Sequence, residues 1–136
     1  MKYLYFSLVL MLCWGCKKNN TSNELSGRYS GMFTAYAGSN EINAPTEITL
    51  SEGRFQVNKG YKLGSGSYIV KNSSEIEFKD ENIWTTEFDW ALILSGNYKY
   101  KIEGGELILT KIINGGSCFL CKDLANNRYQ YKLKKI

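Results

Sequence analysis

The sequence of 136 residues contains no histidine. Histidine is the commonest general base, the commonest zinc ligand and the partner of many serine and cysteine nucleophiles, so its absence removes these arrangements together. Glu75 and Glu77, and likewise Glu87 and Asp89, lie two residues apart, which puts each pair on the solvent side of a strand rather than in a glycosidase-like dyad. Motifs for phosphate, calcium or dinucleotide binding are also missing. We therefore expect a protein that is not an enzyme and that uses no metal or cofactor.

A long hydrophobic run is missing as well. The apolar run over residues 3–12 has about half of the roughly twenty residues that a helix needs to cross a bilayer. Lys2 precedes this run, and the small residue Gly15 follows it, directly before Cys16. A charged start, a short apolar core and a small residue are typical of a secretory signal peptide. With a cysteine directly after it, the segment resembles a bacterial lipoprotein signal, which implies that Cys16 becomes the acylated first residue of the mature chain.

Alternatives to this interpretation concern the leader alone. Cys13 is a second candidate lipid site, but the large Leu12 stands before it where a small residue is expected. An uncleaved anchor or a soluble secreted protein is the other alternative. We expect a signal peptide over residues 1–15, a lipidated cysteine with a flexible tether over 16–24, and one folded domain over 25–136.

The charge is modest, with 17 Lys and Arg against 13 Asp and Glu, for a net charge of +4. Lys132, Lys134 and Lys135 gather part of it near the C-terminus. Such a group can sit near anionic head groups or a polyanion, although a solvated strand end is the favoured interpretation. Nucleic acid is not an expected partner, because the aromatic residues alternate into a core and the charge excess is small.

Apolar residues alternate with a period of two, which predicts strands rather than helices. Glu52-Gly53 and Gly104-Gly105 predict two-residue hairpin turns, and residues 72–74 predict a three-residue loop. The first turn would pair Leu50 with Phe55, and the second would pair Ile102 with Leu107 on a buried face. We expect eight strands, at about 27–36, 46–51, 54–60, 66–71, 75–79, 90–103, 106–113 and 128–134.

The strand over 90–103 is expected to bend at Gly96, since Trp90, Leu92 and Leu94 are in phase with Tyr98. A turn at 95–97, dividing it into two strands, is the alternative. Eight sequential strands with short connections predict an antiparallel up-and-down barrel, because closure removes exposed edges. A two-sheet β-sandwich is the alternative fold.

Several motifs resemble those of lipocalin-like (calycin-type) barrels, in particular small lipoproteins of Bacteroidota. They are the Gly27-Arg28-Tyr29 start of the first strand, residues 88–100, residues 104–111 and the terminal run over 129–135. The resemblance implies the barrel fold and a hydrophobic ligand. The usual first-strand tryptophan of the family, which packs on an arginine at the closed end of the barrel, is Tyr29 here.

Cys118 and Cys121 form a Cys-x-x-Cys motif. A redox motif would need a helix N-terminus within a βαβ unit, and a metal site would need two further soft ligands, and the sequence provides neither. An oxidising envelope favours a local disulfide, provided that residues 118–121 form a turn. Two unpaired thiols in the core are the alternative.

Five aromatic residues are candidates for lining a ligand site: Trp84, Phe88, Trp90, Tyr98 and Tyr100. They could receive a small hydrophobic ligand at a barrel mouth. The alternative, favoured by the solid interiors of small barrels, is that they fill the core.

Two hypotheses for the function follow. In the first, a lipid-anchored, non-catalytic binding protein of the cell envelope holds a small hydrophobic ligand in the barrel. In the second, a solid barrel acts through its loops on another envelope protein, as an interaction module or as an inhibitor of an envelope enzyme. The tether Lys17-Lys18-Asn19-Asn20 lacks an acidic cluster, so we expect the outer membrane, on its periplasmic side.

Overall fold

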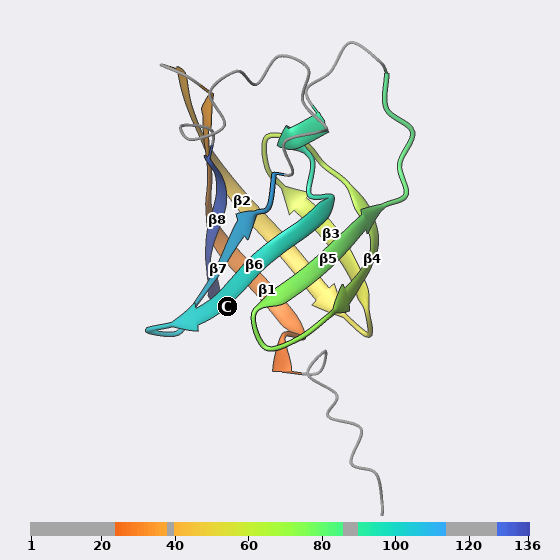
Figure 1. The fold of residues 1–136 in the computed structure, drawn as a ribbon, viewed down its shortest axis with the longest axis vertical. Helices are drawn as coiled ribbons and strands as arrows, with labels where there is room; N and C mark the ends of the chain where they lie inside the picture. Colours follow the sequence, from red (N-terminus) through yellow and green to blue (C-terminus); the bar gives the residue numbers. More distant parts are fainter. Residues whose placement is uncertain (1–23, 38–39, 86–89, 114–127) are drawn as a thin grey trace, which may run out of the picture.

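The computed structural model describes residues 24–37, 40–85, 90–113 and 128–136. Eight antiparallel strands form a closed barrel in which each strand pairs with the next and the last pairs with the first (Figure 1). The predicted up-and-down barrel is confirmed, and the sandwich is not formed. The elements are β1 (Gly27–Ala37), β2 (Asn40–Ser51), β3 (Arg54–Lys59), β4 (Ser65–Val70), β5 (Glu75–Asp80), η1 (Trp90–Leu92), β6 (Gly96–Glu103), β7 (Glu106–Lys111) and β8 (Arg128–Lys135).

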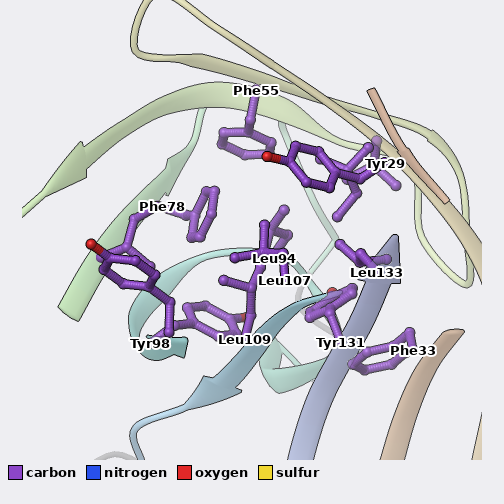
Figure 2. Close-up of a cluster of buried hydrophobic side chains, with 14 of the residues drawn as sticks. Tyr29, Phe33, Phe55, Phe78, Leu94, Tyr98, Leu107, Leu109, Tyr131 and Leu133 are labelled. Carbon is purple, nitrogen blue, oxygen red and sulfur yellow. The ribbon is translucent and has the colours of Figure 1, made fainter. Parts of the chain in front are cut away.

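The inward-facing side chains fill the barrel with one aromatic and aliphatic core (Figure 2). Phe78 lies at its centre, with its ring edge-on to Phe55 at 5.3 Å and to Tyr98 at 5.5 Å between ring centroids. Phe33 and Tyr131 stack at 4.5 Å. Each such pair contributes about 0.5–1.5 kcal/mol beyond the area that it buries. The period of two along the strands therefore predicts the core correctly.

Tight turns connect the strands at one end of the barrel. Glu52 and Gly53 have φ of 49° and 76°, and Gly104 and Gly105 have φ of 59° and 80°, the left-handed pairs that a type I′ hairpin requires. The predicted register follows from them, with Leu50 opposite Phe55. We call this end, with the turns 52–53, 71–74 and 104–105, the turn end. The opposite end, with residues 60–64, 81–85 and 90–95, is the loop end.

The turn end is closed by side chains from both ends of the domain. Leu25 is buried beneath the barrel, and the Tyr29 hydroxyl donates to its carbonyl oxygen at 2.9 Å. The Lys135 ammonium donates to the Ser26 carbonyl at 2.6 Å and lies 6.0 Å from the centre of the Tyr29 ring. A lysine over a tyrosine thus stands where the family resemblance implies an arginine and a tryptophan. Lys132 and Lys134 point outward.

The expected strand over 90–103 is wrong. Residues 90–92 form the short helix η1, and β6 begins only at Gly96, where φ is +90°. The side chains of Leu92 and Leu94 are buried, as the alternation predicted. They enter the core from a turn, however, and not from a strand. The alternative of two strands is also not formed.

The inward position expected for Ile102 is wrong as well. Ile102 does lie opposite Leu107, as predicted, but its side chain is 58% exposed. The neighbouring strand β5 pairs with β6 only as far as Lys99, so Ile102 extends past the end of the core.

The second strand begins at Asn40 rather than at residue 46. Pro45 lies within it, opposite Met32 of β1. Proline is confined to sheet positions where its missing N–H would have had no partner. Pro45 satisfies this condition because β2 pairs with β3 only from Glu47 onward, which leaves one side of its first residues without a strand. Within the parts of the chain that the structure describes, no helix is long and apolar enough to cross a membrane.

Candidate functional site

The predicted ligand-lining residues lie in different environments. Tyr98 is fully buried in the core, where its hydroxyl donates to the Ile93 carbonyl at 3.3 Å and burial raises its pKa well above the ordinary value. Tyr100 is buried toward the turn end and donates to the Asn72 carbonyl at 3.2 Å. These two tyrosines therefore contribute to the filled interior and bond to segments at opposite ends of the barrel.

The tryptophans lie at the loop end. Trp84 is half-buried, and its indole N–H donates to an Asp80 carboxylate oxygen at 2.6 Å. Trp90 is 54% exposed at the start of η1. The remaining predicted site residues, which are Phe88, Cys16, Cys118 and Cys121, lie outside the described residues.

A plug formed by residues 90–95 closes the loop end. Its side chains Leu92, Ile93 and Leu94 are buried against the core. The Lys111 ammonium, from β7, donates to the carbonyl oxygens of Trp90, Ala91 and Ile93 at 3.4, 3.2 and 3.2 Å. The Ile93 N–H also donates to the Trp90 carbonyl, and the Ser95 N–H and the Tyr98 hydroxyl donate to the Ile93 carbonyl. The ammonium thus adds to the bonds that hold the plug.

Beside the plug lies a shallow hollow, which we call the mouth depression. Its walls and floor are formed by Phe33, Thr46, Val57, Gly60, Tyr61, Lys62, Leu92 and Tyr131. It is open to solvent and leaves no space in which a water molecule could be centred. Sites for drug-sized ligands enclose about 300–1,000 Å³. The depression is therefore a shallow surface feature over which a side chain can pack, and it is too small to enclose a lipid.

Thr46 and Tyr131 bring buried polar groups to this hollow, and Lys62 lines it as well. The Thr46 hydroxyl donates to the Ala44 carbonyl at 2.9 Å. Tyr131 is only 4% exposed, and burial raises the pKa of its phenol.

Four large apolar side chains are exposed on segments of the loop end, and Tyr61 among them lines the depression. Tyr61 and Leu63 lie on the segment between β3 and β4, and Ile83 follows β5 with its side chain fully exposed. Together with Trp90, they form a group at the loop end that we call the apolar rim (Tyr61, Leu63, Ile83 and Trp90). Large exposed apolar groups that gather in one place are typical of interaction sites.

Several of the described carboxylates form ion pairs at the surface. Glu81 receives both Arg54 guanidinium nitrogens, at 2.8 and 2.9 Å, and this contact lowers the pKa of the Glu81 carboxyl. Glu77 pairs with Lys71 at 2.8 Å. Among the described residues, no three His, Cys, Asp or Glu side chains are grouped as metal ligands would be. Comparisons with family models, curated proteins and solved structures found no match.

Sequence reasoning missed the mouth depression, because its lining comes from four strands, the β3–β4 segment and the plug. One signal was present in the sequence. Inward residues continue with a period of two from Leu50 back through Thr46 and Ala44 to Ile42. Pro45 concealed this alternation, because proline normally ends a strand.

Proposed function

We propose that this chain is a non-catalytic binding module of the bacterial cell envelope that acts on another protein through the loop end of its barrel. In this proposal, acyl chains on Cys16 hold the protein in the outer membrane, facing the periplasm. The observation that carries the proposal is the apolar rim, whose side chains are exposed while the barrel interior is filled. The burial of apolar area drives most protein association, and aromatic residues are frequent anchors in interfaces.

The position of the tether supports this orientation. The described chain enters the barrel at Glu24, at the turn end. The residues between Cys16 and Glu24 span at most about 26 Å when fully extended. An anchor on Cys16 would therefore keep the turn end near the bilayer and direct the apolar rim away from it.

Site-specific photo-crosslinking in the cells that make the protein tests this proposal. A photoreactive residue at Ile83, on the rim, should give a discrete crosslinked product. The same residue at Ile69, which is also exposed but lies on the outer face of β4, is the control and should not. Equal products at both positions, or none at Ile83, would contradict a role for the loop end. Replacing Cys16 with serine should release the protein from the membrane fraction and remove its acyl mass.

A carrier of a small hydrophobic ligand is the second candidate, favoured by the apolar and aromatic lining of the mouth depression. Organic extraction of the purified protein, followed by mass spectrometry, distinguishes the two candidates. A stoichiometric lipid that survives removal of the anchor would favour the carrier. Its absence, together with unchanged tryptophan fluorescence on adding fatty acids, would favour the protein-interaction module.

A further inference from the structure

The first residues of β2 form an exposed sheet edge. β1 pairs with β2 along its whole length, from Gly27 opposite Leu50 to Ala37 opposite Asn40. β3 pairs with β2 only as far as Lys59, opposite Glu47, after a bulge. Residues 41–46 of β2, which we call the β2 edge, thus have a strand on one side only among the described residues. In Figure 1 the β1–β2 hairpin rises beyond its neighbours at the loop end.

The direction of the backbone groups along this edge follows from the hairpin register. Ser51 and Arg54 flank a two-residue turn, so they form a hydrogen-bonded pair and their N–H and C=O groups face each other. Every second residue of β2 therefore faces β3, and the others face β1. The bond from the Val57 N–H to the Gly64 carbonyl, on the far side of β3, agrees with this alternation.

The same alternation, continued past the bulge, shows which backbone groups of the β2 edge have no strand to pair with. The N–H and C=O of Asn43 and of Glu41 face the side where no described strand lies, as does the carbonyl of Pro45. Unpaired donors and acceptors in this arrangement form a template for another extended chain. Pro45 removes one donor at the inner end of this template and leaves the outer residues intact.

The mouth depression lies directly beside this edge. Thr46 ends the edge and also lines the depression, together with Gly60, Tyr61 and Lys62. A strand added to β2 would alternate its side chains, turning every second one toward the barrel. One inward side chain would then lie over the depression and cover its lining.

The charges near the depression indicate which residues a bound segment would carry. The lining of the depression includes the cation Lys62 and no carboxylate, and Lys59 is exposed at the end of β3 nearby. The edge carboxylate, Glu41, accepts a hydrogen bond from the Asn43 amide at 2.8 Å and another from the Tyr36 hydroxyl. An acidic residue next to the apolar anchor would therefore meet lysines rather than a like charge.

We propose that an extended segment of a partner protein adds to the β2 edge as a further strand, with one apolar side chain packed over the mouth depression and an acidic residue beside Lys62. Backbone hydrogen bonds would supply affinity in this mode, and the depression would supply specificity. This inference rests on the proposed interaction function and specifies the chemistry of the partner.

A pair of variants at one position tests the backbone contact. Asn43→Pro removes the N–H that an added strand would use, and Asn43→Ala removes the same side-chain hydrogen bonds but keeps that N–H. The probe is a phage-displayed library of random ten-residue peptides, selected on the purified protein. Selected peptides should join apolar and acidic residues, bind the unmodified protein and Asn43→Ala alike, and lose at least tenfold in affinity for Asn43→Pro. Circular dichroism of each variant checks the fold.

A charge reversal keeps the proposal testable if Asn43→Pro fails to fold. Lys62→Glu should weaken the selected peptides about tenfold, whereas Lys79→Glu, on the outer face of β5, should not. Equal binding to Asn43→Pro and Asn43→Ala, no effect of Lys62→Glu, or no enriched peptide would each overturn the edge site. A stable dimer that Asn43→Pro dissociates would also overturn it, because the occupant would be a second copy. If crosslinking at Ile83 persists in Asn43→Pro, the proposed interaction function would still hold, but the β2 edge would not be the site of binding.

Discussion

The two ends of the barrel differ in how their residues are used. At the turn end, left-handed glycines, the buried Leu25 and the Lys135–Tyr29 contact close the barrel with short connections. At the loop end, closure depends on the plug, and apolar side chains remain exposed around it. Tight turns are enough to connect neighbouring strands. The segments of the loop end are longer and leave Ile83 and Trp90 exposed, which is typical of loops that bind other molecules. The comparison predicts that substitutions at the two ends have different effects on the stability of the fold.

The largest expected effect is alkaline unfolding, which should begin at the buried phenols of the loop end. Burial raises the pKa of Tyr98 and Tyr131 above the ordinary value of 10.0 in the folded barrel, and unfolding restores that value. Above about pH 10 the unfolded chain therefore binds fewer protons than the folded one, so stability is retained below pH 10 and falls as the pH rises further. Tyrosinate absorbance and circular dichroism should change together. The variant Tyr98→Phe/Tyr131→Phe should shift this transition to higher pH, and an unshifted transition would contradict the assignment.

The same substitution at the two ends should give different free energies of unfolding. Leu25→Ala at the turn end should lower stability by about 3 kcal/mol, because it leaves a cavity under a buried core. Leu63→Ala on the apolar rim should change it by less than about 0.5 kcal/mol, because that side chain is exposed. Urea denaturation measures both values. Similar losses at the two positions would remove the distinction between the ends.

Lys111→Met should loosen the plug while keeping the length of the side chain. Three carbonyl oxygens lose the Lys111 donor, but those of Trp90 and Ile93 keep backbone N–H donors, so the loss should cost about 1 kcal/mol. Hydrogen exchange at the Ser95 amide, which donates to the Ile93 carbonyl, should accelerate. The control Lys79→Met lies on the outer face of β5 and should leave this exchange unchanged. Unaltered protection of Ser95 in Lys111→Met would show that the plug is held in another way.

The smallest expected effect concerns a single turn. Gly53→Ala places a side chain at φ of +76°, where the nearest atom is 3.6 Å away, so backbone strain rather than a clash should cost about 1 kcal/mol. Gly53→Asn should cost less, because asparagine tolerates left-handed conformations. Thermal unfolding of both variants measures the difference. Identical costs would point to a cause other than the backbone angle.

Alternation and turn chemistry predict the turn end well and the loop end poorly. The hairpin at 52–53 follows from local rules, because a glycine with positive φ and a period of two on each side determine the register. Residues 90–95 could not be placed in this way, since Leu92 and Leu94 keep the phase of a strand while the Lys111 ammonium holds them in a turn. The mouth depression depends on segments that are distant in sequence, and no local pattern combines them. The presence of Pro45 within a strand is explained only by the structure, because β3 does not extend far enough to pair with that residue.

The pairing of β1 with β8 also determines when the ring can close. The hydrogen bond from the Ile136 N–H to the Arg28 carbonyl joins the last residue to the start of the domain. A chain emerging during synthesis could therefore not complete the barrel until β8 had been released. Until then the strands would form an open ribbon, with the outer side of β1 still waiting for its partner.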